Sequence, residues 1–498
     1  MSASRERKKR TEQVMQPVQE KKTKKLTQGW IFAICMIAVV VILVGGLIGY
    51  TIYKNTRTVM TVGDHDVTVS EFNYFYTSKV NSISNYASYM GIDTATPLDE
   101  QYVTDSGASM LMLVGVDSSY LTDKTATDGT YNVTWAQLFA DAAKKDAASS
   151  YAVYNEAMAN GFELDEHDAE EEIDENVEQM RAYADNSGMS LGKFIERVYG
   201  KGCSESGYRD FLKVQVVASH YASTLTYSAE EIEAKKAESP EDYAVATYYQ
   251  FSVSASDFVE ADEEGQKADP TDAEKKQAKD AAEAMAKAFD TENESVSIKA
   301  DTAKATAAAF ATEEAANWLF GAAKNDDVKL FENENTYYVL KLIDKADYTT
   351  SDFLQIVIPA DAEELEEGDL TAAEKADKVV AGLEADASVE NFNALAEEYS
   401  ASHESEAKNC TRSQLTSISN EAMFWGMESH SAGDYKVFDA NGNTVILLYV
   451  GEGELYSDVV VTSVLANDHI TEIGEAAEAA CNYDEKTAMT ANVGVYGR

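Results

Sequence analysis

The sequence predicts an α+β protein of several domains, with an N-terminal transmembrane helix, a mostly helical domain and two α/β domains in tandem. Three observations lead to this fold class. A stretch without charged residues separates Lys25 from Lys54. Over most of residues 57–240, apolar residues recur every three or four positions, which is the period of amphipathic helices. Beyond that region the sequence repeats at a period near 100 residues, which indicates a duplicated domain.

Residues 29–53 are predicted to form a transmembrane signal anchor. Residues 30–50 supply the roughly 20 apolar residues that a helix needs to cross ~30 Å of hydrocarbon. The tail 1–28 is basic, and the positive-inside rule keeps such a tail in the cytoplasm. A cleaved signal peptide, the alternative, has a shorter apolar core of about 7–15 residues before its cleavage site. We therefore expect a single-pass cell-membrane protein whose bulk is extracytoplasmic.

The charge balance excludes some classes of partner. The formal net charge is -46, and the tail through Lys25 contributes +6 (nine basic and three acidic residues), which leaves -52 for the remainder. This charge disfavours binding to nucleic acid or anionic lipid and favours basic or unfolded cationic clients. The four cysteines lack the paired spacing of a zinc site or redox dithiol, and the acidic runs lack the pattern of a calcium loop. Neither a metal nor a cofactor is expected.

Residues 57–240 are predicted to form a helical domain that begins with a β-hairpin. Residues 59–62 and 67–69 are β-branched and flank a Gly-Asp turn, and Ser70 is predicted to cap the following helix. Residues 90–130 are polar and weakly periodic, so they are interpreted as an irregular insertion. Further helices are expected at 135–160, 168–186, 190–198, 205–226 and 229–237.

The order of a strand, an aromatic helix and several short motifs supports a more specific interpretation. The motifs are Glu-Ala-Met-Ala-Asn-Gly at 156–161, Met-Ser-Leu at 189–191, Tyr-Gly at 199–200 and Tyr-Arg-Asp-Phe-Leu at 208–212. This region resembles the N-terminal chaperone domain of SurA- and PrsA-type extracytoplasmic foldases. The resemblance implies binding of unfolded proteins outside the cytoplasm.

The repeat consists of residues 243–346 and 351–453, followed by an extension, 454–498, that carries no interpretable motif. Residues 248–253 match 353–358, residues 271–279 match 371–379, and the segment after Trp318 matches the segment after Phe424. A strand, a long helix, a helical middle and a terminal strand recur in the same order, so each copy is predicted to be one domain.

Each copy resembles the parvulin type of peptidyl-prolyl isomerase domain. The second copy carries the stronger pattern, with Phe, Leu-Ala and Ser at 392, 395–396 and 400, and Ser-Ala-Gly at 431–433 before the last hairpin. The resemblance implies an antiparallel sheet covered by helices. It also implies a proline pocket lined by one His in the first strand and another in the last, with an Asp or Cys between them.

Neither copy has this set of residues. The first-strand position is Gln250 or Gln355, and the middle position of the second copy falls near Ala401 or Ser402. The last-strand position falls on Tyr337 or Tyr338 in the first copy and on Thr444 or Val445 in the second. Isomerisation lowers a barrier of roughly 18–20 kcal/mol without breaking a covalent bond, so an apolar pocket could still contribute to catalysis. His403 and His430 are interpreted as surface-loop residues.

The preferred hypothesis is a membrane-anchored chaperone of the foldase type that binds unfolded or nascent secreted proteins, with parvulin-like domains that do not catalyse. An active parvulin-type isomerase and an envelope scaffolding protein are the alternatives. Aromatic residues could contact clients, although core packing would also explain them. The candidates are Phe72, Tyr76, Tyr86, Tyr89, Trp135, Trp318, Phe424 and Trp425.

Overall fold

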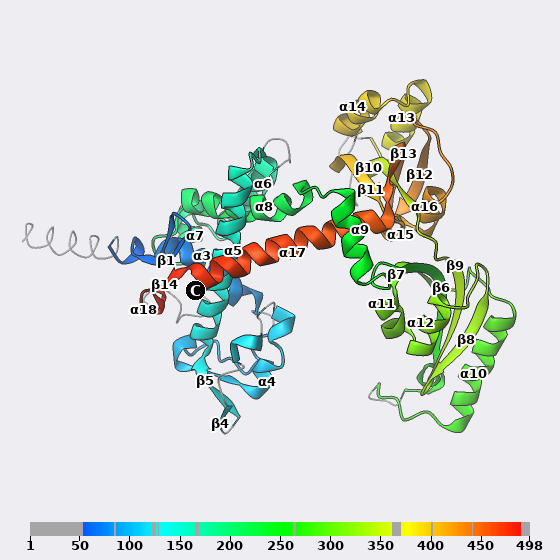
Figure 1. Cartoon of the computed structure of the whole chain (residues 1–498), viewed down its shortest axis with the longest axis horizontal. Helices are drawn as coiled ribbons and strands as arrows, with labels where there is room; N and C mark the ends of the chain where they lie inside the picture. Colours follow the sequence, from blue (N-terminus) through cyan, green and yellow to red (C-terminus); the bar gives the residue numbers. More distant parts are fainter. Residues whose placement is uncertain are drawn as a thin grey trace, which may run out of the picture. The chain divides into compact units, whose positions relative to one another are not determined.

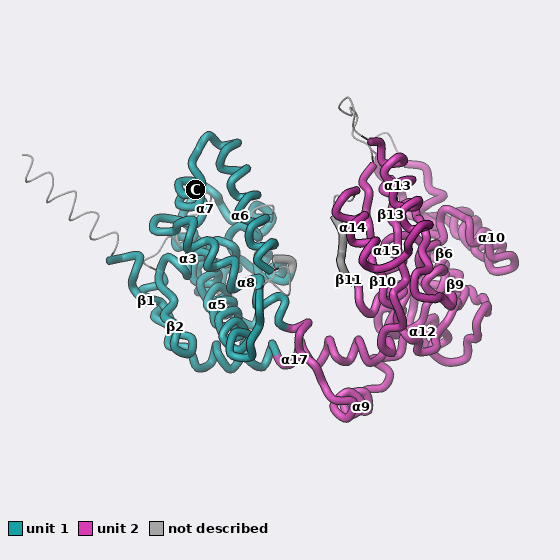
Figure 2. Tube along the Cα trace, turned by 90° about the horizontal axis from the view of Figure 1, so that it is seen from above, with its two compact units in different colours: residues 1–221, 470–498 teal, residues 222–469 magenta. Residues whose placement is uncertain are grey.

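The structure is a computed structural model with an α+β fold. It describes residues 53–83, 86–114, 116, 118–121, 126–127, 129–164, 169–261, 265–360, 370–399, 402–440 and 442–489. The chain divides into two compact units, shown in different colours in Figure 2. Unit 1 consists of Met1–Tyr221 and Ile470–Arg498, and unit 2 consists of Ala222–His469.

The transmembrane part of the predicted fold class and the predicted membrane localisation need correction. Within the described part of the chain, no helix is long and apolar enough to span a bilayer. Helices α5 (Trp135–Ala159) and α17 (Tyr456–Ala480) have 25 residues each. Both carry several charged residues along their length, which would be costly to bury in hydrocarbon. The predicted tail and anchor up to residue 52 lie outside the described residues.

Unit 1 begins with the predicted hairpin, formed by β1 (Thr58–Val62) and β2 (His65–Thr68). Helix α3 (Val69–Ser82) follows directly, but its N-cap is Thr68, and the prediction of Ser70 is wrong. Thr68 has an extended backbone, its hydroxyl accepts a hydrogen bond from the Glu71 N–H, and its own N–H donates to the Glu71 carboxylate. This reciprocal capping box satisfies two backbone donors. Ser70 instead donates its hydroxyl to the Asn55 carbonyl, 2.8 Å away.

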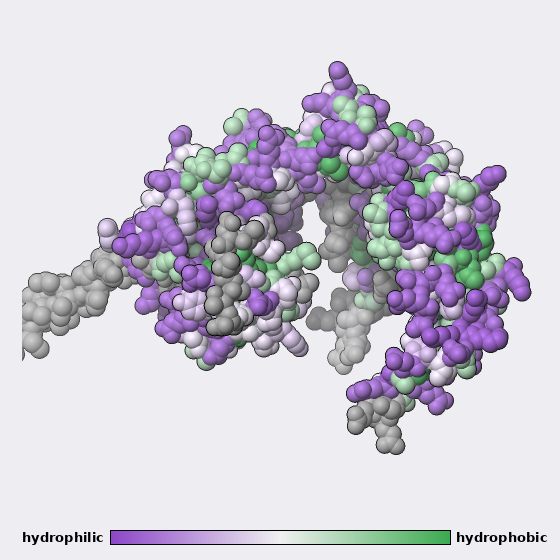
Figure 3. All heavy atoms as spheres, turned by 60° about the horizontal axis from the view of Figure 1, so that its bottom comes forward, coloured by the Kyte–Doolittle hydropathy of each residue, from purple (hydrophilic) through white to green (hydrophobic). Residues whose placement is uncertain are grey.

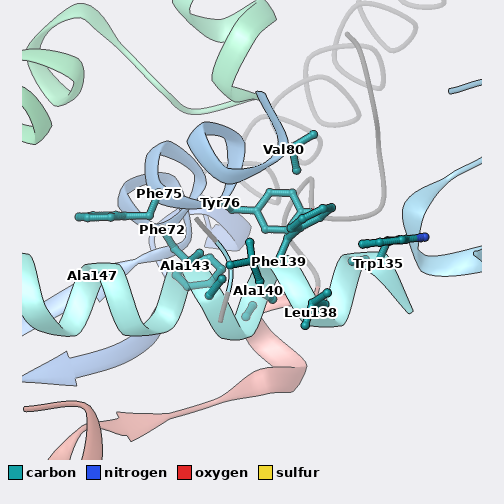
Figure 4. Close-up of a cluster of buried hydrophobic side chains, with 14 of the residues drawn as sticks. Phe72, Phe75, Tyr76, Val80, Trp135, Leu138, Phe139, Ala140, Ala143 and Ala147 are labelled. Carbon is teal, nitrogen blue, oxygen red and sulfur yellow. The ribbon is translucent and has the colours of Figure 1, made fainter. Parts of the chain in front are cut away.

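The five helices predicted after residue 134 are confirmed to within two residues at each end. They are α5 (Trp135–Ala159), α6 (Ala169–Asn186), α7 (Leu191–Tyr199), α8 (Glu205–Thr224) and α9 (Ala229–Glu238). Helices α5, α6 and α7 and most of α8 belong to unit 1, the last three residues of α8 fall in unit 2, and α9 belongs to unit 2. In the main core of unit 1, aromatic residues of α3 meet one face of α5 (Figure 4).

The predicted irregular insertion, 90–130, contains short regular elements where the structure describes it. They are η1 (Leu98–Glu100), β3 (Tyr102–Thr104), α4 (Asp105–Ala108), η2 (Leu111–Val114), η3 (Ser118–Leu121), β4 (Ala126–Thr127) and the start of β5 (Thr130–Thr134). The strands form a sheet in the order β3-β5-β4. Leu98, Val103 and Leu111 are fully buried in the cluster that contains Trp135. The segment therefore contributes to the core of unit 1, although its apolar residues follow no regular period.

The end of the chain completes the first sheet of unit 1. Strand β14 (Asn482–Tyr483) pairs antiparallel with β1, with Tyr483 opposite Met60. Helix α18 (Glu485–Ala488) follows, and Ala488 is fully buried in the main core. The contact joins residues more than 400 positions apart, so no local sequence pattern indicated it.

Unit 2 contains two four-stranded antiparallel sheets with the same topology (Figure 1). In each sheet the strands lie in the order second, first, fourth, third. The first sheet consists of β6 (Val245–Ser254), β7 (Val296–Ala303), β8 (Val328–Asn333) and β9 (Thr336–Asp344). The second consists of β10 (Thr349–Ile358), β11 (Ser402–Cys410), β12 (Tyr435–Ala440) and β13 (Asn443–Leu455).

Helices pack on both faces of each sheet, because alternate residues of a central strand point to opposite faces. In the first copy, α10 (Asp272–Lys287) packs with Phe251 and Val339, whereas α11 (Lys304–Phe310) and α12 (Glu313–Phe320) pack with Tyr248 and Leu340. In the second copy, α13 (Ala372–Ala385) and α14 (Val389–Tyr399) cover one face. Helices α15 (Arg412–Ile418) and α16 (Asn420–Gly426) cover the other.

Candidate functional site

The two glutamines that take the first-strand position of the parvulin pattern occupy equivalent places in the two sheets. Gln250 in β6 pairs with Leu340 of β9 on one side and with Ser297 of β7 on the other. Gln355 in β10 pairs with Leu447 of β13 and with Glu404 of β11. The correspondence between the copies therefore extends to the register of individual residues.

Gln250 forms part of the interior of the first copy. Its side chain is buried, and its Nε2 donates a hydrogen bond to the Phe310 carbonyl at the end of α11, 3.3 Å away. Its Oε1 is also buried and makes no hydrogen bond to any described residue. A carboxamide does not change its protonation state near neutral pH, so Gln250 cannot act as a general acid or base.

The register of β10 and β13 corrects one of the predicted positions. Gln355 and Val357 share a face of the sheet with Leu447 and Val445, because directly paired residues point to the same side. Thr444 pairs with Ile358 and belongs to the opposite face, so it does not lie beside Gln355. Val445 is the residue on the correct face, and its apolar side chain is 4 % exposed.

The same argument selects between the two tyrosines of the first copy. Tyr338 pairs with Ser252, on the face that contains Gln250, whereas Tyr337 packs in the cluster around α10 on the other face. For the middle position of the second copy, Ser402 pairs with Val357 at the start of β11, and Ala401 lies outside the described residues. Neither sheet therefore brings a pair of histidines to these positions.

Neither histidine of the second copy is a surface-loop residue. His403 belongs to β11, where it pairs with Ile356. The His430 side chain is 6 % exposed, and its ring lies 4.4 Å from the Trp425 ring. Its Nε2 lies 2.6 Å from the Trp425 carbonyl oxygen, which is a hydrogen-bonding distance. Contacts with its own copy therefore hold His430 in place.

Four of the eight aromatic residues predicted to bind clients are buried core residues, and two more pack against a core. Phe72, Tyr76 and Trp135 are at most 1 % exposed, and Figure 4 shows Phe72 and Tyr76 between α3 and α5, with Trp135 at the start of α5. Trp425 is 7 % exposed. Trp318 and Phe424 are partly exposed and pack against Phe331 and Tyr249, respectively. The aromatic spacing thus marked the buried side of a helix, which has the same period as an exposed binding face.

Two of the candidates are exposed, and they have exposed apolar neighbours in the sequence. Tyr86 is 41 % exposed and Tyr89 is 72 % exposed. Tyr102 and Met112, within the segment that was predicted to be irregular, are 53 % and 85 % exposed. Figure 3 shows a face on which hydrophilic residues predominate and hydrophobic residues form small separate groups.

A largely buried ion pair joins the two copies within unit 2. Arg412, the first residue of α15, donates from its guanidinium to Asp344 at the end of β9, 2.9 Å away. The two side chains are 10 % and 20 % exposed. The guanidinium carbon also lies 3.9 Å from the centre of the Tyr348 ring, a cation–π arrangement.

Asp301 adds a second link between the copies. It lies at a bulge in β7, where Thr247 faces two residues, and its φ is 46°. Its Oδ2 accepts hydrogen bonds from the Ser413 N–H in the first turn of α15 (2.8 Å) and from the Tyr348 hydroxyl (3.1 Å). Tyr348 in turn accepts from the Arg412 N–H at 2.9 Å. The bulge therefore directs a carboxylate to a helix N-terminus in the other copy, which favours negative charge.

Burial affects the two carboxyl groups to different extents. Burial raises the pKa of Asp301, although the hydrogen bonds from Ser413 and Tyr348 oppose the shift. Burial also acts to raise the pKa of Asp344, but hydrogen bonds from the Ala346 N–H and Arg412, together with the Arg412 charge, hold that pKa below its usual value. Asp344 is therefore the carboxylate whose ionised form is stabilised in this network.

A groove of about 520 Å³ lies beside this network, within the size range of small-ligand sites. It runs between the first sheet and helix α15. Its lining contains one carboxylate and one ammonium group, but no thiol or imidazole. The groove is lined by residues 298–303 of β7, by Thr306 of α11 and Phe310 at the C-terminal end of that helix, and by Ser413, Thr416 and Ser417 of α15. Sequence analysis identified none of them, because the groove forms only where the two copies meet.

Among the residues that the structure describes, no cluster of three or more His, Cys, Asp or Glu residues is arranged to hold a metal ion.

No protein-family model matches the chain, and no curated protein matches it either. The two resemblances therefore rest on the sequence motifs alone.

Proposed function

We propose that this chain is a chaperone that binds unfolded polypeptides, and that its two parvulin-like domains bind chains without isomerising prolyl bonds. The observation that carries the proposal is the placement of Gln250 and Gln355 at the same register in two sheets of identical topology. A duplicated site with glutamine at the same strand position in both copies is better suited to binding than to proton-transfer chemistry.

The condition of the first copy also supports binding without catalysis. Gln250 is buried and donates to the Phe310 carbonyl, so the chain itself fills the position where the resemblance implies substrate contact. In the second copy, Gln355 pairs with Leu447 on one side and Glu404 on the other, and Val357 lies on the same face. Leu447 and Val357 pack in the core beneath α15 and α16, and none of the residues at these strand positions is a histidine.

Charge supports the choice of unfolded polypeptides as ligands. The net charge of -46 keeps the chain soluble and attracts cationic segments over long range. Exposed apolar residues such as Met112 and Tyr89 are available for short-range contacts. We therefore expect basic clients to be bound more tightly than acidic clients, with affinity that falls as salt is added.

Light scattering tests the proposal directly. The full-length chain is added in equimolar amount to a chemically denatured basic protein and, separately, to a denatured acidic protein, each diluted into buffer. Suppressed aggregation, stronger for the basic client and weakened by 0.5 M salt, is expected. Unchanged aggregation of both clients would refute the proposal.

A prolyl isomerisation assay separates binding from catalysis. The unmodified chain is compared with Gln355→His, using a proline-containing tetrapeptide whose isomerisation is coupled to proteolysis. We expect no acceleration by the unmodified chain. Acceleration by the unmodified chain would make it an isomerase with an unusual pocket, and the binding-only assignment of the repeats would be wrong.

A further inference from the structure

Strand β7 is an edge strand of the first sheet, because the strand order is β7-β6-β9-β8. It pairs with β6 on one side only, so alternate N–H and C=O groups on its other side have no partner strand. Such an edge can accept a further strand, and proteins that bind extended peptides in this way use main-chain hydrogen bonds for affinity.

The groove of about 520 Å³ follows this edge. Six consecutive residues of β7, 298–303, line it. The bulge at Asp301 interrupts the alternation of side chains in the middle of this run, and residues on both sides of the bulge line the groove, so the groove runs along the strand. Six residues of extended chain span roughly 20 Å, which is the length of an ordinary strand.

The walls of the groove offer contacts suited to a peptide. Helix α11 contributes Phe310, which is 42 % exposed, and Lys299 extends its ammonium over that ring at 4.8 Å. Helix α15 contributes the hydroxyl groups of Ser413, Thr416 and Ser417. One wall therefore presents an aromatic surface. The Thr416 and Ser417 hydroxyls of the other wall donate to carbonyls of their own helix, and their oxygens can accept hydrogen bonds from main-chain N–H groups.

Charge indicates which peptides fit. Residues 243–346, which contain the first sheet, have 21 acidic and 11 basic residues, a net charge of -10 (11 minus 21). Asp301 and Lys299 both line the groove, and the Asp301 carboxylate already accepts hydrogen bonds from Ser413 and Tyr348. An occupant with positive charge would complement the net charge of the surrounding domain.

We propose that the groove beside β7 binds an extended, basic segment of an unfolded polypeptide, which adds to the first sheet as a fifth strand. The proposal rests on the proposed chaperone function and assigns it a site and a binding mode. A single extended segment is preferred to a second copy of this chain because α11 and α15 flank the edge. A second copy would bring its own flanking helices against them.

N-methylated peptides test the main-chain contacts. The probe is a fluorescein-labelled octapeptide of alternating lysine and threonine, and its partner has the same sequence with N-methyl groups on alternate residues. N-methylation removes the donors along one edge but preserves the side-chain charges. Fluorescence anisotropy with the full-length chain should show at least tenfold weaker binding of the methylated peptide, and equal binding of both would overturn the proposal.

Variants of the groove test its location. Thr306 is exposed on α11 and lines the groove, so Thr306→Trp should fill it and weaken binding of the unmethylated peptide at least tenfold. Ala284→Trp introduces the same residue at an exposed position of α10 outside the groove and should change binding less than twofold. If both variants bind like the unmodified chain, the site lies elsewhere. Circular dichroism of both variants checks that each is folded.

A glutamate-for-lysine version of the octapeptide tests the charge preference, and tenfold weaker binding is expected at low salt. The aggregation assay distinguishes the two proposals. If the unmodified chain and Thr306→Trp suppress aggregation equally and both bind the octapeptide equally, the chaperone function stands and the groove assignment is wrong. If the unmodified chain binds the octapeptide in the groove but suppresses no aggregation, the chaperone function is wrong and the peptide site stands.

Discussion

Replacing Arg412 by Met tests whether the ion pair between the two copies holds unit 2 together. The substitution removes the guanidinium and preserves much of the aliphatic volume. It leaves the Asp344 carboxylate 80 % buried without its charged partner, since that side chain is 20 % exposed. It also removes the cation–π contact with Tyr348.

The size of the effect follows from this burial. Removing one partner of a fully buried ion pair costs about 3–5 kcal/mol. Asp344 retains some exposure and also accepts a hydrogen bond from the Ala346 N–H, so part of that cost is relieved. We expect unit 2 to lose about 2–4 kcal/mol of unfolding free energy, including about 0.5–1 kcal/mol from the lost cation–π contact.

The assay is hydrogen exchange as a function of urea, read separately for peptides of unit 1 and unit 2. Arg181→Met is the matched control, because Arg181 pairs with Glu178 and Glu205 on the surface of unit 1 and is 41 % exposed. Exposed pairs are screened by solvent and contribute little to stability, so the control should have a small effect. If Arg412→Met costs unit 2 no more than Arg181→Met costs unit 1, the ion pair does not stabilise the junction.

Three further predictions follow from the other contacts. The unmodified chain should exceed Asp344→Asn in unfolding free energy by the largest amount at neutral pH. Urea titrations should show this difference shrinking as the pH falls through the lowered folded-state pKa of Asp344, and a difference that grows in acid would contradict the assigned shift. Thr68→Ala should destabilise unit 1 by about 0.5–2 kcal/mol because it removes the N-cap of α3, and Ser70→Ala should cost less; the reverse order in thermal melts would restore Ser70 as the cap. Phe72→Ala should lower the free energy of unfolding by about 3–5 kcal/mol, because the ring is fully buried. Client binding should fall only in proportion to the unfolded fraction. A folded variant with weaker client binding would show that Phe72 contacts clients.

The sequence predicted helices well where burial has a regular period. The five helices between Trp135 and Glu238 were located to within two residues, because four of them have an apolar stripe, and α9 lies between the N-cap Ser228 and Pro240. The same pattern misled the assignment of function. Phe72 and Tyr76 recur at helical spacing because α3 buries that face against α5, and a period alone cannot distinguish a buried face from a binding face.

The cap of α3 shows the limit of local inference. Thr68 and Ser70 are both good N-cap residues, and the sequence alone does not decide between them. The hairpin fixes the choice, since β2 ends at Thr68 and places its hydroxyl beside the Glu71 N–H. Residues 90–130 show the opposite case. Each of their short elements buries only one or a few residues, so their apolar residues follow no period, and the sequence did not reveal their contribution to the core.

By itself, the sequence determined the hairpin, the helices after residue 134, the duplication in unit 2 and the presence of Gln at both first-strand positions, because these are properties of local pattern and residue identity. Only the tertiary structure decided which residues meet across distance. It paired β14 with β1, separated Gln355 from Thr444 onto opposite faces, and joined Asp344 with Arg412 beside a groove. Such contacts depend on strand register and on how folded domains pack, and neither leaves a periodic signal in the chain.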